Sequence, residues 1–371
     1  MSPEGFGAPG AGGLRFHWSL SAVGDPQRRA RAMTAMRGVP DFQAHLEFCR
    51  RAEVCGIESL LMAFGFTRPD PMAWSVALGG RTRSIKFLVA VRSGVSSPSY
   101  FVEQVNTLSS LVGGRVCINI VAGRAPDEHR FYGDFLSHDD RYRRTDEFWT
   151  VCHALWRGGR VDFEGEHYRV EGAAAAGGFA TAGRSRPEVF IGGSSEQAVE
   201  LAVKHADCLL TLPDSPERLA PRIRPVLDAG TEVGLLVSLV SRPTREEAVA
   251  AAYGIVERAG ARAREVHGQV RSRSDSVGFR STYELAERES SWLTRCLWTG
   301  AVPYMGAPSI ALVGSPDEVV EALFEYREVG VTQFLFMGHP DLEQMTFFGD
   351  EILPRVRERE RGRLLPRGAA R

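Results

Sequence analysis

Two glycines followed by two serines, residues 192 to 195, form the segment of this sequence best suited to holding a phosphate group. They follow a short apolar run at 189–191 and precede a helical pattern that continues to His205. Glycines expose the backbone, and the first turn of a helix offers unpaired amides and a favourable dipole to an anion. Ser194 and Ser195 add hydroxyl groups. The alternative is an ordinary serine N-cap, which by itself is the commoner reason for such a pattern.

Two further stretches carry polar side chains that could contact a bound cofactor. His138 and Tyr142 stand four residues apart at the start of another helical pattern, so they share one helix face and could reach a phosphate or a ring edge. A helix N-terminus with solvated charges explains the same pair equally simply. Asn119 is the polar residue of an apolar strand at 116–121, and the small Ala122 and Gly123 after it let a ligand approach the backbone closely.

Familiar catalytic motifs are missing from the sequence. It has no Ser-His-Asp signature, no HExxH pair, no Walker loop and no Gly-x-Gly-x-x-Gly after a strand. The six cysteines are scattered without the spacing of a zinc site, so we expect reduced thiols in the core. A phosphate corner and apolar strand ends, without an obvious nucleophile or metal motif, indicate that a bound organic cofactor supplies the reactive group.

The elements that would position these residues alternate between strand and helix. We expect strands at 16–20, 57–63, 85–91, 116–121, 189–191, 208–212, 233–240 and 333–337. Helical patterns occupy 41–55, the residues after Pro71, 100–112, 146–156, 195–205, 216–228, 244–259, 316–326 and 342–356. Eight such units predict an α/β protein of the (β/α)8, or TIM, barrel class, whose chemistry lies at the C-terminal ends of the strands.

Four segments fall outside this alternation. Residues 1–13 are rich in glycine and proline and are predicted to be disordered, and 359–371 form a basic tail. Between them, 14–358 should form one barrel domain with a hairpin insertion at 160–172. The stretch 260–308, between the seventh and eighth strands, is rich in arginine, serine and glutamate. It is predicted to be either a lid over the site or a surface excursion, and the sequence favours neither.

The overall composition excludes several classes of partner. The net charge of -1 gives no field that would attract nucleic acid or an anionic membrane. No apolar run is long enough for a transmembrane helix, and no leader pattern precedes residue 14. We therefore expect a cytoplasmic protein that binds neither nucleic acid nor membrane.

The ordered motifs of the chain resemble the bacterial luciferase-like superfamily of flavin-dependent monooxygenases, most closely its alkanesulfonate monooxygenase group. The segments that carry the resemblance are 85–98 (IKFLVAVRSGVSSP), 108–123 (LSSLVGGRVCINIVAG), 138–143, 161–172, 190–196 (FIGGSSE), 274–278 (SDSVG), 310–314 (IALVG) and 336–343 (FMGHPDLE). The resemblance implies a (β/α)8 barrel that uses reduced FMN, O2 and an organic substrate. A separate NAD(P)H-dependent flavin reductase would supply the reduced FMN, and the protein would assemble as a homodimer or homotetramer.

The resemblance also implies a flavin site. The matching positions are Asn119, Gly123, His138 and Tyr142, and those of the phosphate corner are Gly193, Ser194 and Ser195, with Ser195 the leading phosphate ligand. At Ala122 the chain departs from luciferase, which has an arginine there, so Tyr142 and the helix N-terminus would contribute more.

The departures are larger in the substrate pocket. Leu236 and Ser238 stand where alkanesulfonate enzymes have an arginine and a histidine, Arg68 replaces their reactive-loop cysteine, and Met305 lies near their lid arginine. Because a sulfonate needs several cationic donors, the resemblance implies another substrate, larger or less anionic, such as a biosynthetic intermediate.

Three polar residues have both a functional and a structural interpretation. His339, which replaces a tyrosine after the eighth strand, is the candidate acid/base because its ordinary pKa lies near neutrality, but it could equally satisfy backbone groups. His17 could face the substrate, although a packed strand histidine is commoner. Arg68 could bind an anionic group or form a surface salt bridge. Two other functions compete with the monooxygenase: an F420-dependent hydride-transfer oxidoreductase and a non-catalytic flavin-binding protein.

Overall fold

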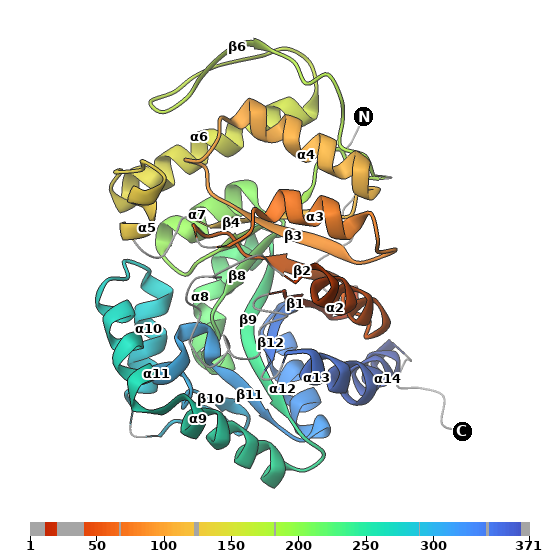
Figure 1. Ribbon diagram of the computed structural model, residues 1–371, viewed down its shortest axis with the longest axis vertical. Helices are drawn as coiled ribbons and strands as arrows, with labels where there is room; N and C mark the ends of the chain where they lie inside the picture. The colour runs from red at the N-terminus through yellow and green to blue at the C-terminus, as the bar shows by residue number, and fades with distance from the viewer. Residues whose placement is uncertain are drawn as a thin grey trace.

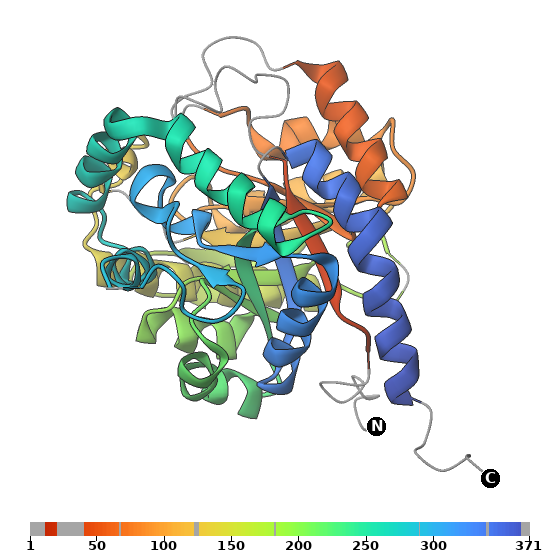
Figure 2. The same cartoon turned by 90° about the horizontal axis from the view of Figure 1, so that it is seen from below.

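Eight parallel strands close into a barrel in the computed structural model, with helices around the outside (Figure 1 and, from below, Figure 2). The structure describes residues 12–20, 41–66, 68–121, 126–181, 183–288, 290–338 and 341–364. The barrel strands are β1 (Arg15–Ser19), β2 (Ser59–Met62), β3 (Lys86–Val91), β4 (Val116–Val121), β7 (Glu188–Gly192), β8 (Cys208–Thr211), β9 (Glu232–Ser241) and β12 (Val331–Gly338). They pair in this order, and β12 pairs with β1, which confirms the predicted (β/α)8 barrel.

The strands are continuous apolar runs because both of their faces are buried. Val89 and Ile118 belong to the large core beneath the surrounding helices, whereas Leu88, Cys117 and Phe190 form a second cluster with Leu335. These alternating positions separate the outer face of each strand from the barrel interior. All six cysteines are buried and unpaired, as expected for core thiols.

The helices follow the predicted periodicity, with changes at their ends. They are α2 (Phe42–Val54), α3 (Pro71–Gly79), α4 (Pro98–Val112), α5 (Pro126–Phe131), α6 (His138–Arg157), α7 (Glu196–His205), α8 (Pro216–Asp228), α9 (Arg245–Ser272), α10 (Val277–Ala286), α11 (Val302–Met305), α12 (Pro316–Glu328), α13 (Asp341–Phe347) and α14 (Leu353–Leu364). Serine side chains cap the N-termini of α4, α6 and α7. Among the described residues, no helix has both the length and the apolar content needed to cross a membrane.

The hairpin formed by β5 (Val161–Glu164) and β6 (Arg169–Ala173) arches over α4 and α6 at the top of Figure 1. The carboxylate of Glu147 in α6 accepts hydrogen bonds from three consecutive amides of its turn, those of Glu166, His167 and Tyr168, at 2.8–3.0 Å. One side chain of α6 thereby holds the tip of the hairpin.

The insertion between β9 and β12 is more regular than its composition suggests. The helix expected to end at Ala259 continues as α9 to Ser272. The backbone leaves the helical conformation at Gly260, where φ is 71°, and the chain then resumes a helix. Two short strands follow, β10 (Leu297–Trp298) and β11 (Ala311–Gly314). β11 pairs with residues 238–241 of β9, beyond the part of β9 that β8 covers. β11 was not predicted, because a strand of four residues shortly after a proline is too short to show a recognisable alternation of apolar and polar residues.

Candidate functional site

A cavity of about 330 Å³ opens at the C-terminal ends of the barrel strands. Its walls come from β1, β2, β3, β4, β7, β8, β9 and β12, from α5, α6 and α10, and from the loops that join them. This is the position at which barrel enzymes place their chemistry. No cluster of side chains suited to a metal ion occurs in the described part of the chain.

One corner of the cavity is polar and is built on the N-terminus of α7. Ser195 is the N-cap, and its hydroxyl accepts a hydrogen bond from the Ala198 amide at 3.2 Å and donates one to the Tyr142 oxygen at 3.3 Å. A Cβ at Gly193 would lie 2.6 Å from the Ala198 Cβ, so glycine is needed for the strand to meet the helix this closely. Burial raises the pKa of Tyr142, which keeps its proton available as a donor.

The N-terminus of α10 meets the same corner. Ser276 caps α10, and a Cβ at Gly278 would lie 2.4 Å from the Ser194 hydroxyl oxygen. The side chain of Arg141 is buried and pairs with Asp275 at 2.5 Å, which ties the start of α10 to α6. Two helix N-termini therefore converge on one point, and their dipoles together favour an anion there.

Three buried polar atoms that have no hydrogen-bond partner in the described part of the chain belong to residues that line the cavity. They are Asn119 Oδ1, Ser194 Oγ and Thr211 Oγ1. Because an unpaired buried polar atom costs about 1–3 kcal/mol, each is expected to meet a ligand or an ordered water. An apolar part of the wall is formed by Leu61, Leu210, Leu236, Leu335 and Met337. The cavity thus suits a molecule with an anionic end and an apolar body that carries polar groups at its edge.

Besides the polar corner, the cavity has a charged region where β3 and α5 border it. Arg92 ion-pairs with Glu128, and its guanidinium carbon lies 5.1 Å from the ring centroid of Phe64. The Nε and Nη1 atoms of Arg92 are buried without a hydrogen-bond partner among the described residues. Arg68 borders the cavity as well.

The structure brings together most of the residues singled out from the sequence. Asn119, His138, Tyr142, Gly193, Ser194 and Ser195 line the cavity, as do Arg68 and Leu236. The rings of His138 and Tyr142 lie 4.9 Å apart, on the shared helix face that their spacing predicts. Ala122, Gly123 and His339 lie outside the described residues, and so do residues 1–11 and 365–371 of the predicted termini.

Two predicted substrate contacts do not line the cavity. Ser238 is fully buried, because β11 pairs beside it and its hydroxyl donates to the Pro308 carbonyl at 3.0 Å. Met305 packs against the small core between α9, β9 and β11. In both cases the cause is the insertion, whose strand β11 pairs along the edge of β9 beyond β8 and whose helices α9 and α11 pack beside it.

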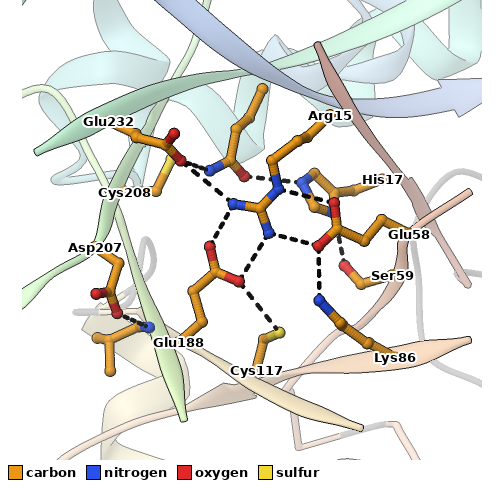
Figure 3. Close-up of polar contacts among 12 residues, drawn as sticks. Arg15, His17, Glu58, Ser59, Lys86, Cys117, Glu188, Asp207, Cys208 and Glu232 are labelled. Atoms are coloured by element: carbon orange, nitrogen blue, oxygen red, sulfur yellow. Dashed lines mark hydrogen bonds and ion pairs between the residues drawn. The ribbon is translucent and has the colours of Figure 1, made fainter. Parts of the chain in front are cut away.

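His17 is the third predicted contact that does not line the cavity, and it lies in a polar network inside the opposite end of the barrel (Figure 3). Its Nε2 lies 2.9 Å from Gln333 Oε1 and its Nδ1 lies 2.8 Å from Ser59 Oγ. The Gln333 amide nitrogen donates to Glu232, so the amide oxygen faces His17, which must carry its proton on Nε2. The packed strand histidine is therefore the correct interpretation.

At the centre of this network, Arg15 pairs with Glu58 and Glu188, each at 2.6 Å, and with Glu232 at 3.3 Å, as Figure 3 shows. Lys86 adds a second cation, 2.7 Å from Glu58. These residues stand at or near the first positions of their strands, so they close the floor of the barrel rather than contribute to the site.

Several cavity residues were not selected from the sequence. Arg92 directly follows β3, and Thr211 is the last residue of β8. A position at the end of a strand was the sequence feature that pointed to them, but it did not distinguish them from other strand ends. Glu128 lies in the short helix α5, which the strand and helix patterns did not include. Gly278 and Phe279 come from the insertion, whose composition gives no indication of which residues turn inward.

With this geometry in place, the chain can be assigned to a family. The model of the luciferase-like monooxygenase family matches residues 14–333, so the chain belongs to that family.

Solved structures with the same fold differ in their cofactors. The EDTA monooxygenase EmoA from Chelativorans sp. BNC1 has a TM-score of 0.72 at 19% identity over 94% of each chain. A type II Baeyer-Villiger monooxygenase from Pseudomonas putida, in complex with FMN, has a TM-score of 0.66 at 17% identity, covering 93% of this chain and 99% of that one. The F420-dependent tetrahydromethanopterin reductase from Methanopyrus kandleri has a TM-score of 0.63 at 15% identity over 93% and 100%. At these identities the likeness establishes the fold alone.

Proposed function

We propose that this protein is a two-component monooxygenase that uses reduced FMN and O2 to oxidise an organic substrate, with a separate NAD(P)H-dependent reductase supplying the flavin. The observation that carries the proposal is a single cavity with two kinds of wall. One corner offers two helix N-termini and the hydroxyls of Tyr142 and Ser194, while four leucines and Met337 form an apolar wall. Family membership and the FMN-bound relative support the same cofactor.

The polar corner would hold the FMN phosphate. The Ser195 hydroxyl is already engaged with Ala198 and Tyr142, whereas the Tyr142 proton and the Ser194 hydroxyl have no acceptor among the described residues. We therefore assign direct donation to Tyr142 and Ser194, together with the α7 amides, and a positioning role to Ser195. Asn119 would meet the polar edge of the flavin ring from β4.

When bound, reduced FMN would supply the two electrons with which one atom of O2 enters the substrate and the other leaves as water. The residues of the chain would position the flavin and the substrate and exclude water from them. Leu210, Leu236 and Leu335 keep bulk water from the reacting face, and α10 of the insertion forms part of the wall, in keeping with a lid. His339 stays the candidate acid/base, to be tested by His339→Ala, which should lower turnover more than flavin affinity.

The proposed substrate is not a simple alkanesulfonate, although the cofactor architecture resembles that of the alkanesulfonate group. Leu236 lines the cavity without a charge, and Ser238 is covered by β11. Among the described residues, the arginines that line the cavity are Arg68 and Arg92, and Arg92 is already paired with Glu128. A larger and less anionic molecule, such as a biosynthetic intermediate, fits this wall better.

An F420-dependent hydride transfer is the second candidate, because an F420 enzyme shares the fold over nearly its whole length. The reaction of the reduced cofactor with O2 distinguishes these two candidate functions. A pulse of O2 on the complex with reduced FMN should be consumed, and oxidised FMN should reappear more slowly than in free solution. Reoxidation at the rate of free reduced FMN would favour either F420 chemistry or a flavin-binding protein without turnover.

The phosphate assignment is tested by comparing reduced FMN with reduced riboflavin under anaerobic conditions. The wild-type protein should bind FMN at least about tenfold more tightly, because charge-assisted hydrogen bonds contribute roughly 1.5–3 kcal/mol each. Tyr142→Phe and Ser194→Ala should shrink this preference, and Ser195→Ala should weaken FMN binding with the fold intact. Equal affinity of wild type and Tyr142→Phe for FMN would remove the assignment.

A further inference from the structure

Four aromatic rings gather beside the cavity, on the loop after β2 and on the segment at the end of α5. The ring centroids of Phe64 and Tyr132 lie 5.3 Å apart, those of Phe66 and Tyr132 5.6 Å, and those of Phe66 and Phe131 5.2 Å. Phe64 lines the cavity, whereas Phe66 and Phe131 are 56% and 59% exposed. A contiguous group of exposed rings at the edge of a cavity marks a binding surface.

The two segments are held together by a carboxylate. Glu128 Oε1 accepts the Phe66 amide at 3.1 Å, and the same side chain pairs with Arg92. The aromatic rings and the guanidinium therefore form one assembly, in which Arg92 lies 5.1 Å from the Phe64 ring and 5.8 Å from the Tyr132 ring. We call this assembly the aromatic clamp: Phe64, Phe66, Phe131, Tyr132, Arg92 and Glu128.

Arg92 is held in place, and part of its hydrogen-bonding capacity is left over. Its neighbour Ser93 is held on both sides, by Thr145 at 2.8 Å and by the Tyr168 hydroxyl, which donates to its carbonyl. The Arg92 side chain is only 8% exposed, and its Nε and Nη1 have no hydrogen-bond partner among the described residues. A rigid, buried donor that borders a cavity is a site for an acceptor on a ligand.

The charge of the clamp selects the kind of acceptor. Glu128 already balances the Arg92 cation, so a carboxylate or sulfonate arriving at Arg92 would also face the Glu128 carboxylate. A neutral oxygen accepts the same hydrogen bonds without that repulsion.

From these observations we infer the class of substrate: a flat aromatic ring that bears a carbonyl or phenolic oxygen. The ring packs against the clamp rings, and the oxygen accepts from Arg92. The inference rests on the proposed function, because it takes this cavity as the place where the substrate is oxidised.

The test is titration calorimetry of the chain with matched two-ring probes. 1-Tetralone and 1-naphthol should bind, naphthalene should bind about tenfold more weakly for want of the hydrogen bond, and 1-naphthoate and hexanesulfonate should bind more weakly than 1-naphthol. Failure of 1-tetralone and 1-naphthol to bind, or hexanesulfonate binding as tightly as they do, would overturn the inference.

Three variants locate the binding. Phe66→Ala, at an exposed ring, should weaken 1-naphthol binding about three- to tenfold. Arg92→Met should reduce 1-naphthol to the affinity of naphthalene. Glu128→Gln removes the opposing charge and should raise the affinity for 1-naphthoate relative to 1-naphthol. Unchanged affinities in Phe66→Ala and an unchanged preference in Glu128→Gln would contradict the clamp. A thermal melt of each variant confirms folding.

Reduced FMN affinity is measured on the same samples. It should be unchanged in Phe66→Ala, because Phe66 is exposed and does not itself line the cavity. Loss of probe binding with FMN binding intact would overturn the substrate class alone, whereas no affinity for reduced FMN in the wild type would overturn the proposed function.

Discussion

The contact between Gly278 and Ser194 shows how closely single residues define the phosphate corner. An alanine Cβ at position 278 would lie 2.4 Å from the Ser194 hydroxyl oxygen, which would have to rotate away. Position 278 lies in the first turn of α10, where alanine is compatible with the backbone, so the fold itself should tolerate the change.

We predict that Gly278→Ala weakens reduced FMN binding with little change in melting temperature. The matched control is Gly268→Ala in α9, where no atom lies within 4 Å of the added Cβ. That change should leave FMN affinity unaltered and stabilise the helix by about 0.5–1 kcal/mol. Anaerobic fluorescence titration of both variants is the measurement, and equal FMN affinities would contradict the proposed contact between Ser194 and the phosphate.

At the scale of elements, the start of α10 depends on one ion pair with α6. Arg141 and Asp275 are 5% and 24% exposed, so the pair is well shielded and its loss would leave a buried guanidinium without its carboxylate. The pair therefore ties the start of α10 to α6, the two helices that border the phosphate corner.

We therefore expect Asp275→Ala to lower stability by about 1–3 kcal/mol and to weaken FMN binding. The control is Glu287→Ala, which removes the exposed pair between Arg271 in α9 and the end of α10 and should change neither quantity measurably. Urea unfolding and FMN titration are the measurements. If both variants behaved alike, α10 would not be held by the Arg141 pair.

At this scale the sequence predicted the barrel but not the surroundings of its strands. Eight apolar runs separated by helical periods were enough to place Asn119, Tyr142 and Ser195 at strand ends or helix starts on one rim. The covering of Ser238 by β11 and the inward turn of α10 depend on long-range pairing, which short periods do not reveal. Arg92 was one of many residues at strand ends, and its partner Glu128 lies in a helix that the periodic patterns did not include, so nothing distinguished it from the others.

For the whole molecule, the buried histidines make stability depend on pH. Burial, aided by the charges of Arg186 and His205, lowers the pKa of His153 from 6.5 to about 4. Burial also lowers the pKa of His17 in the barrel floor. The unfolded chain thus binds more protons than the folded one below pH 6.5, so stability falls as the pH is lowered through that window.

The His153 contribution should amount to roughly 3 kcal/mol between pH 6.5 and 4. His153→Gln should therefore flatten the decline of the melting temperature over this window, as followed by circular dichroism. Equal slopes for variant and wild type would show that His153 is not held neutral.

Glu58 causes a further loss of folding stability at lower pH. Burial opposes its ionisation, but the hydrogen bond and charge of Arg15 prevail and lower its pKa, with Lys86 contributing. A depressed carboxyl pKa stabilises the fold above about pH 4.3, the ordinary glutamate value, and that stabilisation is lost as the pH falls further. Glu58→Gln should lower the melting temperature at pH 7 more than at pH 3, and the same drop at both would contradict the role of the ion pairs.

Anaerobic titration with reduced FMN beside reduced F420 distinguishes the two possible cofactors of the cavity. We predict quenching of protein fluorescence by reduced FMN at stoichiometric concentrations, with reduced F420 binding far more weakly. Tight binding of reduced F420 together with no measurable affinity for reduced FMN would contradict the account.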